Sequence, residues 1–305
     1  MIELVVTDLD DTLVARNKLI ASKRCLHSIH QMLNAGVVCG PATGRDISHV
    51  GYLYRFDKAC YQTAIVANGM RVYYNGEGVL TKELDREGMR KADDVVSQDE
   101  RACILAYQAD NRSWASGTTV DEMVEHHMGH LRNCSGVDRY NPDTFSLVKA
   151  NVQFDGPLED QNELMEALQQ ACPELSFSCP VGGIIDITAH GWDKGEAALW
   201  LAHYLGIADA EIAAFGDAGN DYQMIKKVPN SVAVANAFDE IIDTARWHIG
   251  FAEDDAVATA FEDIAQAVQE QRMPKFMSTE ENEKYLKLAH QIKTVVPSVR
   301  CRDKQ

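Results

Sequence analysis

Short apolar runs alternate with amphipathic stretches through the first 75 residues of the chain. Leu4 to Val6 form an apolar, β-branched run that predicts a buried strand, and apolar residues between positions 18 and 35 recur at helical spacing until Gly36. Two more short strands are predicted at 37–39 and 64–67. Strands and helices in this order predict βαβ units, and therefore an α/β fold with parallel strands.

The pattern changes near residue 81 and returns near residue 190. Residues 82–130 are mostly polar with helical spacing, broken by an apolar run at 103–107. Farther along the chain, we predict strands at 149–154, 175–179 and 183–188, and a helix at 161–172. The earlier pattern then resumes, with a helix at 196–206, strands at 212–215 and 231–237, and helices at 238–246 and 253–270. We therefore predict a core from residues 1–81 and 190–270, and a separate α/β domain from residues 82–189 inserted into it.

The last segment, residues 271–305, carries an apolar stripe at helical spacing. Its members are Tyr285, Leu288, Ala289, Ile292, Val295 and Val296. Ser278 and Glu281 resemble a capping box at the start of this predicted helix, and Pro297 ends it. We expect the helix to pack on its own core. The alternative is a docking helix for a second subunit, so a homodimer through this helix or through the inserted domain stays open.

Composition and charge narrow the classes of partner. The 305 residues carry a formal net charge of −17 and no basic stretch, which argues against a nucleic-acid partner. No apolar run approaches the ~20 residues of a membrane span, so no membrane partner is expected. The acidic start and the eight scattered cysteines without a C-x-x-C pair favour a cytoplasmic protein with reduced thiols. An anionic substrate would need local cations in so acidic a protein.

The first candidate site lies directly after the first predicted strand, where Asp8 and Asp10 are two residues apart. In extended chain the two carboxylates lean to one side and repel each other, which implies a divalent metal ion, a shared proton, or both. One chemistry uses such a pair: the first carboxylate attacks phosphorus, and the second transfers protons to and from the leaving alcohol and water. The alternative is an acidic turn that caps the next helix.

Two further segments offer groups that bind anions. Thr43 and Gly44 follow the second strand and precede a helix, where a hydroxyl, backbone N–H groups and the helix start favour a phosphate. Lys194 stands at a helix start, where its charge opposes the helix dipole unless an anion is bound. The alternatives are an ordinary capped turn and an exposed lysine. Asn68 is a weaker candidate, because Asn68-Gly69 is also a common turn dipeptide.

A second acidic loop follows the strand at 212–215 and contains Asp217, Asn220 and Asp221. Asp217 can supply a metal ligand opposite Asp8, and an all-oxygen ligand set favours Mg²⁺. The alternative is a turn rich in Asp and Asn. Glu122, His126 and His130 also share one predicted helical face, but they lack a zinc-protease motif and we interpret them as a solvated surface.

Taken in order, these motifs resemble a known family. DLDDTL (8–13), ATGR (42–45), HGWDKGEA (190–197) and GDAGND (216–221) are similar to the four motifs of the haloacid dehalogenase-like hydrolases, specifically the Cof-type branch with a IIB-class α/β cap. The resemblance covers about residues 1–270. It implies a Rossmann-like, doubly wound parallel sheet with an inserted α/β cap domain that selects the substrate. Asp11 stands where this family usually has Gly.

The resemblance also implies a role for each motif residue. Asp8 would be the nucleophile and a Mg²⁺ ligand, and Asp10 the general acid and base, which also lends its backbone carbonyl to the metal. The phosphate would be held by Thr43, Gly44, Lys194 and Asn220. The metal would be held by Asp8, Asp10 and Asp217, with Asp221 in the outer shell.

We therefore predict a Mg²⁺-dependent phosphatase that hydrolyses a small phosphorylated metabolite, with a sugar phosphate as the expected substrate. A phosphomutase of the same superfamily uses the same nucleophile and stays an alternative. The other alternative is a non-catalytic phosphometabolite-binding protein, which would be expected to lack one of the motif residues.

Overall fold

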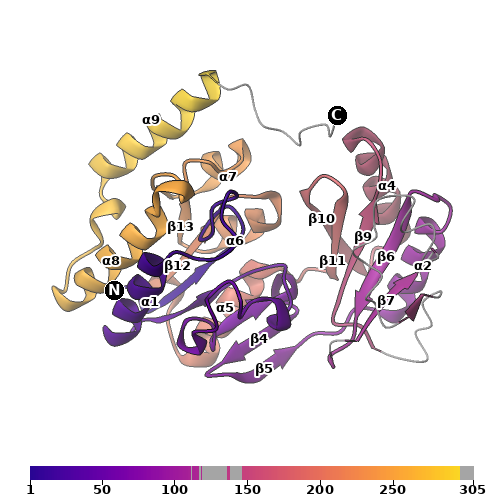
Figure 1. Cartoon of the computed structure of the whole chain (residues 1–305), viewed down its shortest axis with the longest axis horizontal. Helices are drawn as coiled ribbons and strands as arrows, with labels where there is room; N and C mark the ends of the chain where they lie inside the picture. Colours follow the sequence, from indigo (N-terminus) through magenta and orange to yellow (C-terminus); the bar gives the residue numbers. More distant parts are fainter. Residues whose placement is uncertain (111, 117, 119–135, 138–145, 296–305) are drawn as a thin grey trace. The chain divides into compact units, whose positions relative to one another are not determined.

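The computed structural model describes residues 1–110, 112–116, 118, 136–137 and 146–295. The chain forms two compact units (Figure 1). One contains Met1–Leu80 and the described chain from Asp193 onward, and the other contains Thr81–Trp192. Glu122, His126 and His130 lie outside the described residues, as do Val296 and Pro297.

The first unit is built on a five-stranded parallel sheet in the order β14-β13-β12-β1-β2. Its strands are β1 (Leu4–Thr7), β2 (Val38–Pro41), β12 (Ile212–Gly216), β13 (Asn230–Ala233) and β14 (Trp247–His248). The central strand β1 is buried along its length, as its continuous apolar run predicts. The parallel sheet confirms the predicted α/β fold class.

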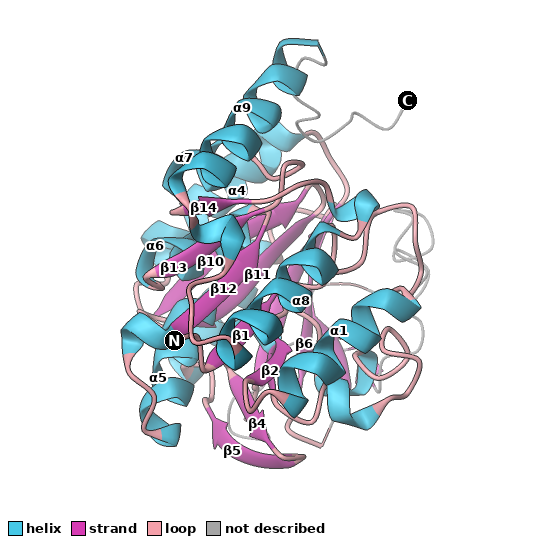
Figure 2. Ribbon diagram, turned by 90° about the vertical axis from the view of Figure 1, so that its left-hand side faces the viewer, coloured by secondary structure: helices cyan, strands magenta, loops and turns pink. Residues whose placement is uncertain are grey.

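Helices cover both faces of this sheet (Figure 2). On one face, α1 (Lys23–Asn34) packs against α8 (Ala256–Gln269), and their apolar residues share a core with Val5 and Phe215. On the other face, α5 (Lys194–Leu205) packs against α6 (Tyr222–Lys227). The short helix α7 (Asp239–Thr244) follows β13. Alternate side chains of each strand therefore enter different helix layers.

A smaller sheet extends the edge of the main one beyond β2. It contains β3 (Ala64–Val66), β4 (Arg71–Tyr74) and β5 (Glu77–Thr81), in that order. The Thr43 N–H donates to the Ile65 carbonyl (2.9 Å) and joins the two sheets. Gly40 permits this approach, because a Cβ at that position would lie 1.8 Å from the Thr63 carbonyl oxygen. Asn68 and Gly69 form the turn between β3 and β4, as expected.

The second unit is a six-stranded sheet in the order β10-β11-β9-β6-β7-β8, with two helices packed together beside it. Its strands are β6 (Ala102–Tyr107), β7 (Ser113–Ser116), β8 (Gly136–Val137), β9 (Lys149–Phe154), β10 (Leu175–Val181) and β11 (Ile184–Ala189). Its helices are α2 (Arg86–Val96) and α4 (Leu158–Ala171). We expected residues 82–130 to be mostly helical apart from the apolar run at 103–107, and this was wrong for residues 113–116, which form a strand paired with β6.

The C-terminal helix α9 (Thr279–Val295) packs on β14 of the first unit. Ala289 is buried, and the Asn282 side-chain oxygen accepts the backbone N–H of His248 (2.8 Å). The helix thus contacts its own core, as we expected from the apolar stripe. Among the described residues, no helix is both long and apolar enough to cross a bilayer.

Candidate functional site

The carboxyl ends of three parallel strands bring together the predicted site residues of the first unit. β1 lies between β12 and β2, and Thr7 is in register with Phe215 and Pro41. Asp8 follows β1 directly and Asp217 follows β12, so both carboxylates leave the sheet at the same edge. Thr43 follows β2 at that edge as well. The chain after β1 leads to α1 on one face of the sheet and the chain after β12 leads to α6 on the other, and ligands of α/β proteins bind at such a point.

A buried carboxylate cluster forms at this edge. Oxygens of Asp8, Asp217 and Asp221 all lie within 4.8 Å of one another, and all three residues are buried. Lys194 Nζ donates to Oδ1 of Asp8 (2.7 Å) and to Oδ1 of Asp221 (2.7 Å), and its side chain has no exposed surface. Three carboxylates and one ammonium group leave a charge of −3 + 1 = −2 when all four are ionised.

Burial controls the protonation of this cluster. Desolvation raises the pKa of Asp8 from its ordinary 3.8 to about 8, although Lys194 opposes the shift. Desolvation and the neighbouring carboxylates likewise raise the pKa of Asp217 well above its ordinary value. Burial disfavours the charge of Lys194, but Asp221 and Asp8 outweigh it and raise its pKa. The excess negative charge is therefore costly to bury, and a divalent cation with a preference for oxygen fits this donor set.

Asp221 and Asp217 are each held by neighbours that limit their freedom. Asp221 Oδ2 accepts the backbone N–H groups of Asp217 (3.0 Å) and Ala218 (3.2 Å), while its Oδ1 accepts Lys194. Thr12 Oγ1 donates to Oδ1 of Asp217 (2.6 Å), across 205 residues of sequence. No role was predicted for Thr12, although its position in DLDDT, four residues after Asp8, makes it part of the motif.

Asp10 lies outside the buried cluster and has a different partner. Its side chain is 58% exposed, and Arg45 holds it with two hydrogen bonds, Nε to Oδ2 (2.8 Å) and Nη2 to Oδ1 (2.7 Å). Arg45 Nη1 also donates to the Tyr52 hydroxyl (3.1 Å). Arg45 belongs to the ATGR motif, but no role was predicted for it, and Tyr52 was not predicted as a site residue.

Asp11 directly follows Asp10 and has a left-handed backbone with φ 60°. Glycine adopts this conformation most readily, and Asp tolerates it better than most other residues. Asn236 Nδ2 donates to the Asp11 carbonyl (2.7 Å) and holds the turn. Asp can therefore occupy the position at which the family usually has Gly.

Two of the predicted phosphate-binding residues, Thr43 and Gly44, lie on the β2 side of the site. Thr43 is buried, and its Oγ1 accepts the Arg45 backbone N–H (3.1 Å), which leaves its hydroxyl hydrogen able to donate to an anion. A Cβ on Gly44 would lie 3.1 Å from Oδ1 of Asn68. Asn220 Nδ2 donates to that same Asn68 oxygen (3.4 Å). The weak candidate Asn68 therefore stands between Gly44 and Asn220.

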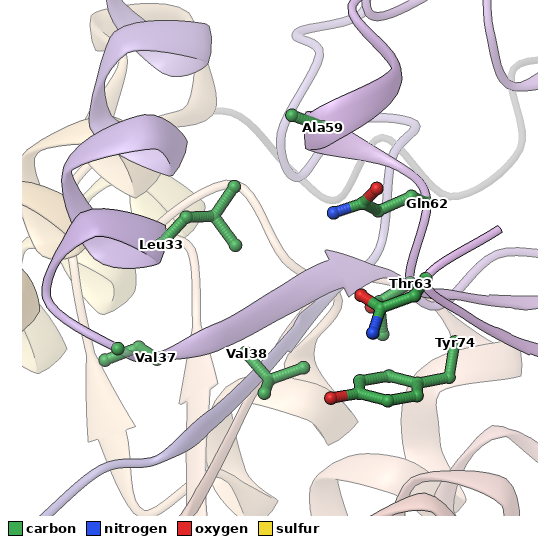
Figure 3. Close-up of a pocket in the computed structure, with 9 residues that line it drawn as sticks. Leu33, Val37, Val38, Ala59, Gln62, Thr63 and Tyr74 are labelled. Carbon is green, nitrogen blue, oxygen red and sulfur yellow. The ribbon is translucent and has the colours of Figure 1, made fainter.

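The first unit also contains a cavity of about 150 Å³ away from these strand ends (Figure 3). Val37 and Val38 line it at the start of β2, whereas Thr43 follows the end of that strand. Leu33, Ala59 and Tyr74 line it from neighbouring segments. Because it holds none of the clustered carboxylates, this cavity is not the candidate active site.

Comparisons with known proteins agree on one family. A family model described as haloacid dehalogenase-like hydrolase matches residues 5–261. The 5-amino-6-(5-phospho-D-ribitylamino)uracil phosphatase YbjI of Escherichia coli (strain K12) is 24% identical over 82% of this chain and 91% of its own length. The HMP-PP phosphatase of Citrobacter koseri is 25% identical over 79% of this chain and 87% of its own length.

Solved structures show the same fold. The HAD subclass IIB sugar phosphatase BT4131 superposes with a TM-score of 0.72, at 16% identity over 86% of this chain and 98% of that one. TM0651 from Thermotoga maritima superposes with a TM-score of 0.68, at 22% identity over 86% of this chain and 97% of that one. At these identities the likeness concerns the fold alone.

Proposed function

The chain belongs to the haloacid dehalogenase-like hydrolases, and we propose that it is a Mg²⁺-dependent phosphatase that hydrolyses a small phosphomonoester through an aspartyl-phosphate. The observation that carries the proposal is the pairing of two unlike carboxylates. Asp8 is buried beside Lys194, whereas Asp10 is exposed and held by Arg45. A nucleophile and a proton-transfer group require these two different environments.

Asp8 is the proposed nucleophile. One carboxylate oxygen would attack phosphorus, the bond from phosphorus to the leaving alcohol oxygen would break, and water would then release phosphate from the aspartyl-phosphate. Lys194 holds Oδ1 of Asp8 and would orient the carboxylate for attack. Thr43, Gly44 and Asn220 would receive the phosphoryl oxygens.

The metal-binding residues fit Mg²⁺ by charge and by donor type. Asp8 and Asp217 would bind it, together with the backbone carbonyl of Asp10. Both oxygens of Asp221 already accept hydrogen bonds, which supports an outer-shell role. When bound, Mg²⁺ would supply the positive charge that keeps Asp8 ionised and offsets the charge on the phosphoryl group.

Asp10 is the proposed general acid and base. The two guanidinium hydrogen bonds from Arg45 orient the Asp10 carboxylate, which suits the removal of a proton from the attacking water. To donate a proton to the leaving alcohol, Asp10 would first have to take up a proton from solvent, which requires the pair with Arg45 to open. The exposure of Asp10 leaves room for that movement.

The substrate is proposed to be a small phosphorylated metabolite, with sugar phosphates first. This choice is supported by the names of the relatives, which are phosphatases of phosphorylated metabolites and a sugar phosphatase. The domain at 82–189 is proposed to select among such substrates. A cytoplasmic location and a homodimer stay predictions from the sequence.

The proposal is tested by release of phosphate from p-nitrophenyl phosphate and a panel of sugar phosphates, nucleotides and cofactor phosphates. We expect Mg²⁺-dependent turnover that Asp8→Asn abolishes and the matched control Asp11→Asn retains, since Asn also tolerates a left-handed backbone. An Asp8→Asn protein with more than about a tenth of wild-type activity would contradict the role of Asp8. Isomerised product without free phosphate would instead identify a phosphomutase.

A further inference from the structure

A second group of metal-ligating side chains lies in the first unit and shares no residue with the Asp8 cluster. His30 lies on α1, Asp57 precedes the short 3₁₀ helix η2 (Lys58–Cys60), and Cys60 ends it. One ligand atom from each residue lies within 4.8 Å of the other two. The three residues therefore join two segments that are 27 residues or more apart in sequence.

The three ligand atoms converge on one point. Asp57 Oδ2 lies 2.7 Å from Nε2 of His30, and Cys60 Sγ lies 3.9 Å from that same nitrogen. A catalytic Cys-His-Asp triad would place the carboxylate and the sulfur on opposite nitrogens of the ring. This geometry therefore excludes a triad in the described arrangement and matches a set of ligands around a shared centre.

The orientation of Asp57 agrees with that interpretation. Asp57 occupies the N-cap position of η2, yet its side chain makes no capping hydrogen bond and is directed to His30 instead.

We propose that His30, Asp57 and Cys60 bind one thiophilic divalent cation, with Zn²⁺ as the preferred ion. A set of one nitrogen, one oxygen and one sulfur suits Zn²⁺, whereas Mg²⁺ prefers oxygen alone. Tetrahedral bonds of about 2.0–2.3 Å place ligand atoms roughly 3.3–3.6 Å apart. The 2.7 Å and 3.9 Å separations reach this range with small side-chain rotations. Partial exposure of His30 (41%) and Asp57 (34%) leaves a fourth position to water.

The ion would cross-link α1 to η2. These two elements also flank the cavity of Figure 3, where Leu33 of α1 faces Ala59 of η2. A cavity between two elements forfeits packing contacts that would otherwise hold them together. Metal binding at the adjacent ligands would therefore stabilise this part of the first unit. This added stability would depend on the three ligand residues and not on catalytic activity.

The probe is Co²⁺, added to the full chain after treatment with a chelator and in excess Mg²⁺, which competes at oxygen-ligand sites. A thiolate ligand gives cobalt a near-ultraviolet charge-transfer band that carboxylate ligands do not give. We expect this band at one equivalent, its displacement by Zn²⁺, and a higher melting temperature with Zn²⁺. Cys60→Ala and His30→Ala should lose the band, while His27→Ala, an exposed residue one turn earlier on α1, should keep it.

Three outcomes would overturn the proposal. One is no band at excess Co²⁺ in the wild-type protein. Another is a band that persists in Cys60→Ala, which would assign it to another cysteine. The third is a band that persists in both His30→Ala and Asp57→Asn, which would mean a lone thiolate. Far-ultraviolet circular dichroism of each variant separates loss of metal from loss of fold. Turnover of p-nitrophenyl phosphate by the same variants, expected unchanged, keeps this result independent of the proposed phosphatase function.

Discussion

At the scale of single residues, the site depends on how charges are partnered. Lys194 is fully buried and neutralises one of three carboxylates, so the cluster has an excess of two negative charges when all three carboxylates are ionised. Asp10 is exposed and paired with the single guanidinium group of Arg45. A buried ion pair contributes little net stability because desolvation offsets its Coulomb energy, and an exposed pair contributes little because solvent screens it. We therefore interpret both pairs as devices that orient reacting groups.

The role of Arg45 gives a prediction at this scale. Arg45→Met removes both hydrogen bonds to Asp10, and we expect kcat to fall about 10–100-fold while KM changes less, because the general acid and base is no longer oriented. The loss should be greater with a sugar phosphate than with p-nitrophenyl phosphate, whose leaving group needs little protonation. Tyr52→Phe removes only the hydroxyl group that accepts from Arg45 Nη1, so this control should lose less activity. Equal losses on both substrates would contradict this role.

At the scale of elements, the strands place the reactive side chains at one edge of the sheet, and the loops supply the groups that hold them. The sequence indicated β1, β2 and β12, because short apolar runs followed by polar residues mark the carboxyl ends of buried strands. It did not indicate the pairs Thr12–Asp217 and Arg45–Asp10, since their partners are 205 and 35 residues apart and share no local pattern. The polar strand at 113–116 was missed because its pairing partner, not its composition, fixes its conformation.

Gly216, at the end of β12, provides the prediction for this scale. A Cβ there would lie 2.7 Å from Cβ of Asp221 and 2.9 Å from its Oδ2, so Gly216→Ala must displace the acidic loop. We expect a loss of stability of about 1–3 kcal/mol in urea denaturation and weaker Mg²⁺ activation. Gly78→Ala in β5 is the matched control, because its Cβ would meet only Tyr73 at 3.7 Å. Wild-type activation by Mg²⁺ in Gly216→Ala would contradict the expectation that the acidic loop requires Gly at this position.

At the scale of the whole molecule, the acidic charge conflicts with the proposed anionic substrate. The chain carries a net charge of −17, which repels a phosphate ester from most of its surface. Lys194, Arg45 and a bound cation would supply positive charge only where the phosphoryl group is held. Negative charge is also concentrated in the buried carboxylate cluster. The free energy of unfolding should therefore depend on how that charge is offset.

The pH dependence of stability tests this balance. Asp8 binds its proton with a pKa of about 8 in the folded protein and 3.8 ordinarily, so between these values the folded state retains a proton that the unfolded state has lost. With a chelator present, the contribution of this group to the free energy of unfolding should therefore fall as pH rises from about 4 to 8. Mg²⁺ competes with these protons, so the Mg²⁺-induced rise in melting temperature should grow over the same window. Asp217→Asn should flatten that trend, and an equal Mg²⁺ effect at every pH would refute the coupling.

The most direct test of the account is to identify the covalent intermediate. The enzyme is quenched with acid during turnover of a substrate found in the phosphate-release screen, and the acyl phosphate is then reduced with borohydride, which converts a phosphorylated aspartate to homoserine. We predict homoserine at position 8 by peptide mass spectrometry, dependent on Mg²⁺ and on substrate. Reduction at another residue, or turnover that leaves residue 8 unmodified under every quench time, would contradict the claim that Asp8 carries the phosphoryl group.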